Sequence, residues 1–290
     1  MAAAALTLAP AGTDPALLDG YARLFARCFP GTTHLDARYL DWLYRENPCG
    51  TVVGFDAWEG ATLAAHYVCI PVDAVLDGVA VRALLSLNTA TDPDFQGRGL
   101  FTRLAEATYE LGARLGYGAV YGVANVNSTP GFLRKLGFTL VRPLDARLGF
   151  GRAQPSAWDE VLHAARFRRA WSHASLAWRI ASPARPYRLV RIASDTLGAA
   201  TGTGRPGIQA WAELPAACAP EAPFARGPLA VKLHLGLTPR KFQARRALWF
   251  DIPSRLRPSP LNLIFRPLAQ GAAIPDGDGV LMNVLDFDAY

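Results

Sequence analysis

The clearest pattern along the chain joins an apolar run to an amphipathic segment through a glycine turn. Val79 to Leu87 is almost entirely apolar, which predicts a buried strand. Leu100 to Leu115 carries its leucines on one stripe and its charged residues away from it, which predicts an amphipathic helix. Gly97 and Gly99 lie between them and allow the backbone to turn tightly and approach a ligand. This arrangement can hold a phosphate group at the helix N-terminus, although an ordinary tight connection has the same pattern.

Two helices and two strands are predicted before this joint. The first helix runs from Pro15 to about Cys28, since proline is favoured at the first helical position. The second runs from Asp36 to Arg45 and ends before a proline. Thr51 to Trp58 and Thr62 to Val72 are predicted strands. An Asp-Gly pair at 77–78 then predicts a hairpin turn into the apolar run.

The alternation of strands and helices continues after the amphipathic helix. Ala119 to Asn125 predicts a second buried strand, and Asn127 to Phe138 predicts a short helix. Gly137 suits a left-handed helix cap. Phe138 to Phe150 can supply one or two more strands, and Gly151 to Ser156 has the composition of a linker.

The glycine turn resembles a known cofactor loop. Gln96 to Phe101 (QGRGLF) is similar to the (Arg/Gln)-x-x-Gly-x-(Gly/Ala) pyrophosphate loop of the GNAT acyltransferase superfamily. The elements after the loop follow that family's order: a helix, a strand and a short helix that ends in Gly-Phe. The resemblance therefore covers residues 60–150. It implies an α/β fold with a mixed, mostly antiparallel, splayed sheet flanked by helices. Phe101 departs from the pattern, which prefers Gly or Ala, and we interpret its ring as packing away from the phosphates.

The resemblance also implies which residues contact the cosubstrate, acetyl-CoA or another acyl-CoA. Main-chain groups at the end of the apolar strand would bond the pantetheine arm, and the loop amides would bond the pyrophosphate. Arg98 would add a charge-assisted contact or remain solvated, and Asn127 would lie beside pantetheine or act only as a helix cap. The expected contacts are Thr89, Ala90, Thr91, Gln96, Gly97, Arg98, Gly99, Leu100, Phe101 and Asn127.

The catalytic groups are less clear, because two features of the family are missing. Leu133 stands where the family has a tyrosine acid, and the strand before the loop has no carboxylate. Ser86 and Asn88 are the polar residues there, and alternation predicts that they share one face. His66, on the preceding strand, is a candidate general base or a structural histidine. We favour a version in which water takes the proton and Asn88 orients the amine or the water.

Residues 151–290 repeat part of this order. Ser175 to Pro183 echoes Tyr39 to Pro48, since each has Leu-x-Trp, a short polar stretch and a proline before a strand. If Trp42 and Trp178 are equivalent, they should lie on matching helices. Trp158 to Trp171 is helical in pattern, and the glycine-rich stretch 202–207 is expected to be a surface turn because no amphipathic helix follows. Strand-like runs occur at 187–192, 208–214, 229–235, 248–252, 261–265 and 280–286.

We therefore predict two units. Residues 1–150 would form a GNAT-like catalytic domain that binds acyl-CoA, and residues 151–290 a second, degenerate GNAT-like domain without a pyrophosphate loop. Residues 1–150 hold 12 Lys and Arg against 14 Asp and Glu, whereas residues 151–290 hold 18 against 10. The basic half suggests an anionic partner, or simply an arginine-rich surface.

Composition narrows the setting. Of 290 residues, 51% are hydrophobic and 19% charged, which is typical of a globular protein. Four cysteines without paired spacing and five scattered histidines predict neither a disulfide framework nor a metal site. No apolar run approaches the ~20 residues of a membrane span, and we expect a cytoplasmic protein.

The predicted function is acyl-CoA-dependent N-acylation, with acetyl as the expected acyl group. The acceptor would be a primary amine, such as an amino sugar or a nucleotide-linked amine, acylated directly in a ternary complex. One alternative is a tandem-domain aminoacyl transferase that uses charged tRNA, although nucleic acid is not the expected partner. The other is a non-enzymatic CoA-binding protein. The sequence leaves the acceptor, acyl chain length and oligomeric state open.

Overall fold

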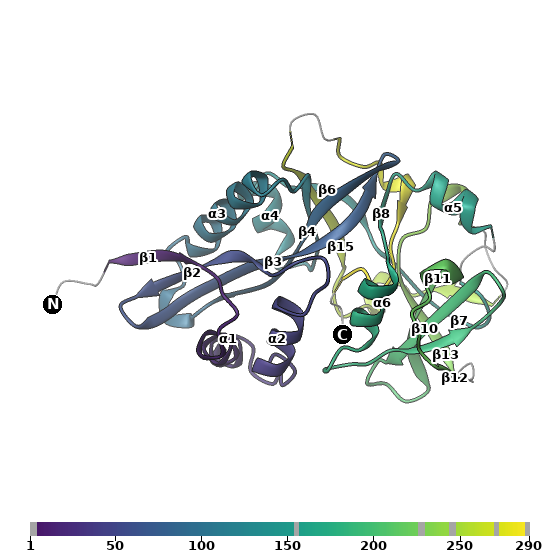
Figure 1. The fold of residues 1–290 in the computed structure, drawn as a ribbon, viewed down its shortest axis with the longest axis horizontal. Coiled ribbons are helices and arrows are strands. Elements are labelled where there is room, and N and C mark those ends of the chain that lie inside the picture. Colours follow the sequence, from purple (N-terminus) through teal and green to yellow (C-terminus); the bar gives the residue numbers. More distant parts are fainter. Residues whose placement is uncertain (1–4, 154–156, 226–229, 244–247, 270–272, 288–290) are drawn as a thin grey trace.

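The computed structural model describes residues 5–153, 157–225, 230–243, 248–269 and 273–287. Two sheets lie side by side in an elongated molecule, the first with helices on both of its faces (Figure 1). The predicted fold class, a mixed and mostly antiparallel α/β structure flanked by helices, is confirmed. None of the described helices is long and apolar enough to cross a membrane.

In chain order, the first half forms β1 (Leu6–Pro10), α1 (Pro15–Cys28), α2 (Ala37–Tyr44), β2 (Val53–Glu59), β3 (Thr62–Leu76), β4 (Val79–Thr91), α3 (Leu100–Arg114), β5 (Ala119–Ala124), α4 (Thr129–Lys135), β6 (Thr139–Pro143) and β7 (Asp145–Gly149). The second half forms α5 (Trp158–Ala164), β8 (Phe167–Arg169), α6 (His173–Ile180), β9 (Arg188–Arg191), β10 (Thr196–Gly202), β11 (Ile208–Pro215), β12 (Phe224–Ala225), β13 (Val231–Gly236), β14 (Trp249–Asp251), β15 (Asn262–Pro267) and β16 (Val280–Leu281).

The predicted helices and strands of the first half are confirmed, apart from β1, which the sequence pattern did not reveal. Two predictions in the second half are wrong. The strand expected at 280–286 is a strand only at Val280–Leu281, and residues 284–287 form a turn. The helix expected from Trp158 to Trp171 ends at Ala164, and Phe167–Arg169 forms a strand instead. The reason is tertiary, because β8 pairs with the far end of β3 on one side and with β16 on the other. Sheet pairing overrides the local helical pattern there.

The two sheets repeat one strand order. In the first sheet the order is β1-β2-β3-β4-β5-β15-β6, and in the second it is β12-β9-β10-β11-β13-β7-β14. From β2 and from β9 onward the pairings are antiparallel, antiparallel, parallel, antiparallel and antiparallel in both sheets. Within this shared series, the parallel pair is β4 with β5 in one sheet and β11 with β13 in the other.

The halves exchange one strand each. β15 comes from the second half of the chain but lies between β5 and β6 in the first sheet. β7 comes from the first half but lies between β13 and β14 in the second sheet. The sheets therefore do not separate at residue 150, and the division of the chain into domains at that position stays a prediction. Where the two exchanged strands begin, the amide of Leu144 donates to the carbonyl of Leu261 at 2.7 Å.

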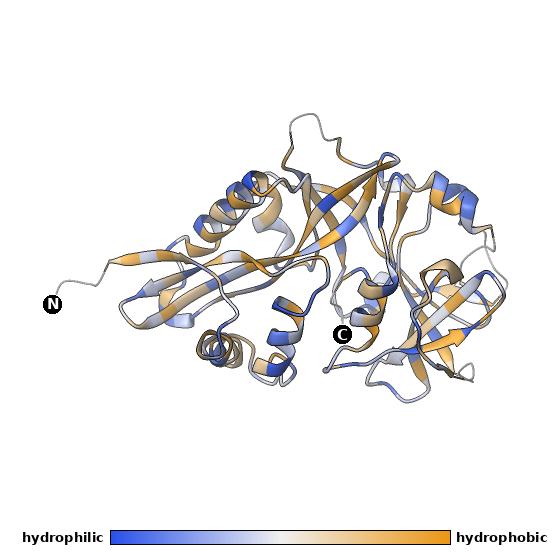
Figure 2. Ribbon diagram, viewed as in Figure 1, coloured by the Kyte–Doolittle hydropathy of each residue, from blue (hydrophilic) through white to orange (hydrophobic). Residues whose placement is uncertain are grey.

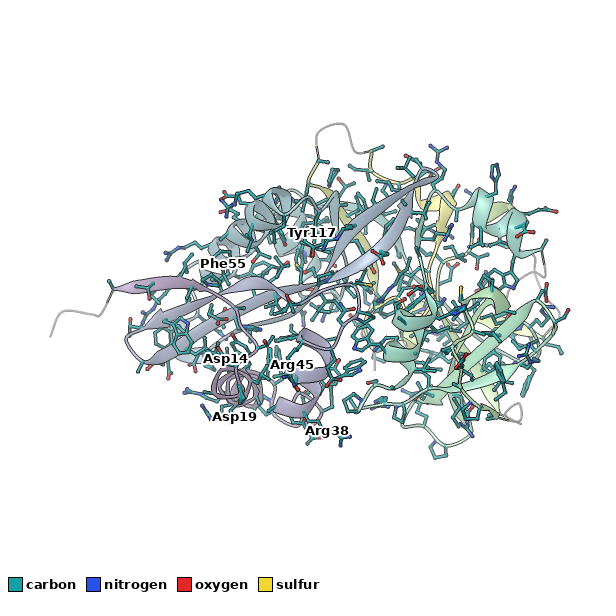
Figure 3. All side chains as sticks on the ribbon, viewed as in Figure 1. Asp14, Asp19, Arg38, Arg45, Phe55 and Tyr117 are labelled. Carbon is teal, nitrogen blue, oxygen red and sulfur yellow. The ribbon has the colours of Figure 1, made fainter. Side chains whose placement is uncertain are left out.

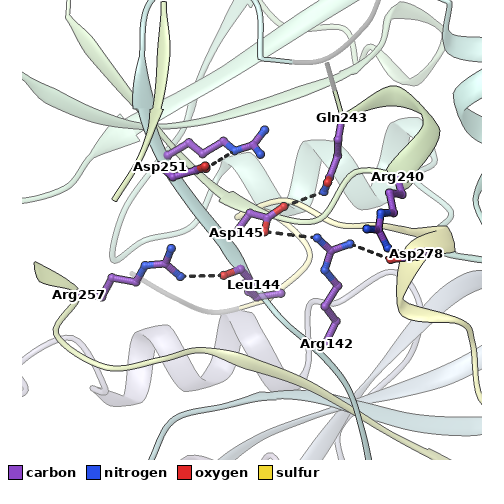
Figure 4. A network of polar contacts seen from close by, with 9 residues as sticks. Arg142, Leu144, Asp145, Arg240, Gln243, Asp251, Arg257 and Asp278 are labelled. Carbon is purple, nitrogen blue, oxygen red and sulfur yellow. Dashed lines mark hydrogen bonds and ion pairs between the residues drawn. The ribbon is translucent and has the colours of Figure 1, made fainter. Parts of the chain in front are cut away.

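Polar side chains surround this crossing (Figure 4). Arg257 Nη1 donates to the carbonyl of Leu144 at 3.2 Å. Arg142 forms ion pairs with Asp145 at 3.6 Å and Asp278 at 3.4 Å. The backbone and side-chain contacts of the crossing thus tie the start of β7 to segments of the second half.

Two apolar layers enclose the first sheet. One packs α1 and α2 against one face, and the other packs α3 and α4 against the opposite face. Figure 2 shows the hydrophobic residues gathered along the strands of this sheet. Asp19 on α1, Arg38 on α2 and Arg45 just after α2 are exposed charged residues (Figure 3).

The halves meet at two tryptophans. Trp42 is the sixth residue of α2 and Trp178 the sixth residue of α6, so the prediction that they lie on matching helices is confirmed. Their rings stack with centroids 4.7 Å apart and planes inclined by 19°. Each indole N–H donates to the other residue's carbonyl, at 3.3 and 3.1 Å. The contact is reciprocal, as expected for two equivalent helices facing each other.

Candidate active site

The first sheet opens between β4 and β5. These strands pair only through Ala83–Leu85 and Ala119–Tyr121. Beyond that point, residues 86–91 of β4 and 122–124 of β5 have no partner on the other strand. Main-chain groups along such an opening are available to a ligand, because backbone N–H and C=O groups seek partners. The residues expected to hold pantetheine, Thr89, Ala90 and Thr91, lie on this open edge of β4.

A β-bulge reshapes β4 inside the opening. His66 pairs with Ala90 but Val68 pairs with Leu87, so two residues of β4, Asn88 and Thr89, stand opposite one residue of β3. Asn88 adopts a left-handed backbone with φ of 49°. The prediction that Ser86 and Asn88 share a face is therefore wrong, because the extra residue breaks the alternation between them.

Ser86 points toward α3. Its hydroxyl lies 2.7 Å from that of Tyr67, which lies 2.6 Å from that of Tyr109. Cys69 Sγ donates to the same Tyr67 oxygen at 3.7 Å. Burial raises the pKa of Tyr67 and of Tyr109, and burial raises the pKa of the Cys69 thiol to about 12. All these groups stay protonated near neutral pH, so this cluster joins β3, β4 and α3 without offering a base.

Asn88 points the other way, into a chain of buried polar groups under α1 and α2. Asn88 Nδ2 donates to the hydroxyl of Tyr44 at 3.1 Å. That hydroxyl lies 2.9 Å from His66 Nε2, and His66 Nδ1 lies 2.6 Å from Asp56 Oδ1. With His66 Nδ1 donating to Asp56, the hydrogen bonds run in one direction, from Asn88 to Tyr44 to His66 to Asp56.

His66 has no exposed surface. The ring of Tyr21 covers it at a centroid distance of 4.0 Å, and Tyr21 also donates to Asp56 Oδ2 at 2.7 Å. Tyr44, likewise fully buried, stands between the histidine and Asn88. His66 thus reaches the opening only through these two residues.

The glycine loop leads directly from β4 to α3. Gly97 and Gly99 have left-handed φ values of 77° and 71°, and a Cβ at either position would meet nothing within 4 Å. Gly99 is the N-cap of α3. Among the residues that the structure describes, none supplies an acceptor to the amides from Gly97 to Phe101. These amides are free at the positive end of a helix dipole, which is the geometry that binds phosphate.

The side chains beside the loop have partners of their own. Arg98 Nη1 donates to Glu59 Oε1 at 3.1 Å, and its guanidinium lies 4.7 Å from the centroid of the Phe95 ring. The Phe101 ring packs edge-on against Phe132 of α4, with centroids 5.3 Å apart. The interpretation of Phe101 as a packing residue is confirmed. Arg98 would have to leave Glu59 to touch a phosphate.

Asn125, which sequence reasoning passed over, organises the end of β5. Its side-chain oxygen accepts from the amides of Asn127 and Ser128, both at 3.0 Å. These bonds form a turn just before α4, whose N-cap is Ser128, so the reading of Asn127 as the helix cap is wrong. Asn127 itself is exposed, next to the opening side of β5. Its predicted contact with pantetheine stays a prediction.

Tyr121 does not face the opening as a free acid. It is buried, and its hydroxyl donates to the carbonyl of Asp286 at 3.1 Å. Burial raises its pKa further above the ordinary tyrosine value. Within the described residues, no group of three His, Cys, Asp or Glu side chains is placed to hold a metal ion.

The splayed parallel pair, the bulge and the free loop amides lie together at one end of the first sheet. Residues 13–141 match the profile of the acetyltransferase (GNAT) domain, which confirms the resemblance of the glycine loop. This part of the chain is thus similar to a GNAT domain, the class of domain that carries out N-acyl transfer. No curated protein sequence matches the chain.

Solved structures share the fold over nearly the whole chain. A GCN5-related N-acetyltransferase from Kribbella flavida superposes with a TM-score of 0.61 at 14% identity, covering 94% of this chain and 74% of that one. A GCN5-related N-acetyltransferase from Anabaena variabilis gives 0.55 at 10% identity, covering 91% and 73%. A conserved protein of unknown function from Enterococcus faecalis gives the same four values. These likenesses extend through the second sheet and concern the fold alone.

Proposed function

We propose that the opening between β4 and β5 holds an acyl-CoA, acetyl-CoA in the first instance, and that its acyl group passes directly to a primary amine. One observation carries the proposal. The free amides from Gly97 to Phe101 lie at the end of the same strand whose open edge begins at Ser86. Pyrophosphate on the loop and pantetheine along the strand would place the thioester near the bulge at Asn88.

The reaction would proceed in one ternary complex. The neutral amine attacks the thioester carbonyl, the C–S bond of the tetrahedral intermediate breaks, and the amide and CoA thiolate form. The amine loses one proton to water and the thiolate gains one, so the reaction is neutral overall. A thiolate is a good leaving group and needs no dedicated acid, which agrees with Leu133 at the tyrosine position.

Asn88 would orient the amine or the water that takes its proton. Its amide group cannot accept a proton to a useful extent. Tyr44, His66 and Asp56 fix its side chain through the buried hydrogen-bond chain. We therefore assign Asn88 a contact with substrate, and we assign His66 a positioning role behind it. Ser86 would support the strand from the opposite face.

The acceptor would be an anionic or nucleotide-linked amine, or an amino sugar. The net positive charge of residues 151–290 supports an anionic acceptor. The rival functions differ in what they require. An aminoacyl transferase would bind charged tRNA with a steep salt dependence, whereas a CoA-binding protein would bind acyl-CoA without turnover.

Release of free CoA thiol tests the proposal. Acetyl-CoA and longer acyl-CoAs are mixed with the protein and a library of amines, and thiol release is followed together with the mass of the acylated product. We expect turnover with at least one primary amine. Binding of acyl-CoA without release of thiol across the library would instead support the CoA-binding alternative.

The loop prediction uses a matched pair of glycines. Gly99→Val should weaken CoA binding at least ~10-fold, because the side chain and its altered backbone block close approach of the phosphates. Gly78 in the β3–β4 turn has nearly the same φ, 79°, and equally open surroundings. Gly78→Val should therefore cost similar stability but leave CoA affinity unchanged. Calorimetric titration measures both, and normal affinity in Gly99→Val would remove the basis of the cofactor assignment.

A further inference from the structure

The second half contains a cavity of about 120 Å³ that the proposed chemistry does not use. It lies where α5, β8, the end of β11 and the segment after β16 come together. Trp158, Trp171 and Leu214 supply apolar wall, and Cys218 lies beside them. Arg168 and Arg169, consecutive residues of β8, also line it.

Both arginines keep buried donors without a partner. Within the described residues, no acceptor lies within hydrogen-bond distance of Arg168 Nε or Arg169 Nη2, although the buried Asp286 carboxylate interacts electrostatically with Arg169. Arg169 is only 6% exposed, and its guanidinium lies 3.9 Å from the centroid of the Trp171 ring. A buried N–H donor without an acceptor costs free energy, and the cost is greater for a charged group. A ligand that brings acceptors would remove it.

The acidic groups of the lining, in contrast, are already satisfied. Asp286 accepts from Trp171 Nε1 at 3.0 Å and from the amide of Asn283 at 2.6 Å. Glu213 accepts from Trp211 Nε1 at 2.9 Å and from the amide of Ala153 at 2.7 Å. The cavity therefore lacks acceptors rather than donors, which points to an anionic ligand.

The position of the cavity has a counterpart in the first half. β11 and β13 pair only through 208–210 and 231–233, and β11 then runs on unpaired with β13, as β4 does beside β5. Glu213, Leu214 and Pro215, beyond the last pair, line the cavity. The segment after β16 enters this second opening, where Leu237 and Met282 exchange backbone hydrogen bonds. In the second sheet, protein therefore occupies the opening in which a CoA-sized ligand would lie, and only the small cavity remains.

We propose that this cavity binds a small monocarboxylate with a short apolar chain, its carboxylate on Arg168 and Arg169 and its chain against the tryptophans. An arginine guanidinium suits a carboxylate, since it can donate two parallel hydrogen bonds to it. The nearby Asp286 and Glu213 carboxylates disfavour a doubly charged phosphate. The short apolar walls favour a chain of a few carbons over a bare ion. The site is separate from the acyl-CoA opening.

Butyrate is the probe, titrated into the full-length protein by calorimetry and followed by thermal unfolding. Arg168 is half-buried, so Arg168→Gln should fold and should weaken butyrate binding at least ~10-fold, as expected for a charge-assisted contact. Arg205→Gln, at an exposed turn of the same half, is the matched control and should bind normally. Cys218→Phe should also abolish binding, by filling the cavity while keeping both arginines.

Inorganic phosphate and butylammonium are the comparison ligands. Both should bind at least ~10-fold more weakly than butyrate if the cavity selects its ligand by charge and size as proposed. Acetyl-CoA affinity should stay unchanged in Arg168→Gln and Cys218→Phe, which separates this site from the cofactor site. Equal binding of butyrate to the parent protein and to folded Arg168→Gln would overturn the proposal. No detectable butyrate binding, or tighter binding of phosphate, would also overturn it.

Discussion

Asn88 decides which way the β4 side chains point. Its left-handed backbone is unfavourable for most residues, but asparagine tolerates it better than others. The hydrogen bond from its side chain to Tyr44 helps to hold this conformation. The same bulge turns Asn88 toward α2 while Ser86 stays under α3. One residue thereby separates a polar group on the α2 side of β4 from one on the α3 side.

The buried chain behind Asn88 gives a prediction for kinetics. Tyr44→Phe removes the hydroxyl that joins Asn88 to His66, so Asn88 should lose its fixed orientation. We expect kcat to fall roughly 10-fold with little change in KM for acetyl-CoA, because positioning is lost while cofactor contacts remain. Tyr109→Phe, which removes a buried hydroxyl on the other face, should keep kcat within about 2-fold of the parent.

His66 separates the two proton routes. If water takes the proton, His66→Ala should lower kcat no more than Tyr44→Phe does and should leave the pH–rate profile in place. If His66 takes it through Tyr44, His66→Ala should cost about 100-fold or more and remove the acid limb of the profile. The second result, in a folded variant with normal CoA affinity, would reverse our assignment.

Sequence patterns could nominate Asn88, Ser86 and His66 but could not arrange them. Period-two alternation assumes an unbroken strand, and nothing in the letters around residue 88 reveals the bulge. Tyr44 and Asp56 were missed because their importance arises from contacts between residues far apart in the chain. The glycine loop was found because its chemistry is local: strand, turn and helix are consecutive in the sequence.

At the scale of elements, α2 and α6 are short helices that gain support from each other. Each has eight residues, too few to be stable alone in water. Each begins with a side-chain cap, Asp36 or Ser172, that accepts an amide hydrogen bond. The stacked tryptophans bury their rings and satisfy both indole N–H groups. The contact joins the two halves through matching positions, which explains why Leu-x-Trp recurs in the sequence.

A double-mutant cycle measures this contact. Trp42→Phe and Trp178→Phe should each destabilise the protein by ~1–3 kcal/mol through lost packing and a lost hydrogen bond. The double variant should cost less than the sum by ~0.5–1.5 kcal/mol, because the two rings share one interaction. Urea unfolding gives the values. Trp58→Phe on β2 is the control, and its effect on stability should add to that of Trp42→Phe. If Trp42→Phe and Trp178→Phe were equally additive, the stacking would contribute little.

At the scale of the molecule, the sequence predicted two similar halves but not how they are joined. Periodicity identified the strands around residues 138–150 and 261–265, and those strands exist. It could not assign β7 and β15 to sheets, because a strand's sheet depends on partners more than a hundred residues away. Nor could it show that the segment after β16 occupies the opening of the second sheet. Local patterns specify elements, whereas long-range pairing decides the topology.

The strand exchange predicts that neither half folds alone. Residues 1–150 without the rest would leave β5 and β6 without β15 between them and would carry β7 without its sheet. Residues 151–290 would have the reverse defects. Each piece would expose unpaired strand edges and apolar surface, which favours aggregation over folding. We expect the intact chain to unfold in one cooperative transition and residues 1–150 alone to show neither cooperative melting nor CoA binding.

Complementation completes the test. When the two pieces are produced together, β7 and β15 can each reach their own sheets, and we expect a complex that melts cooperatively and binds acetyl-CoA. A split at 202–207, in the exposed turn between β10 and β11, is the matched control for cutting the chain as such. If residues 1–150 alone bound acetyl-CoA as tightly as the intact chain, β15 would be dispensable for binding. The boundary predicted at residue 150 would then describe the folding units better than the two sheets do.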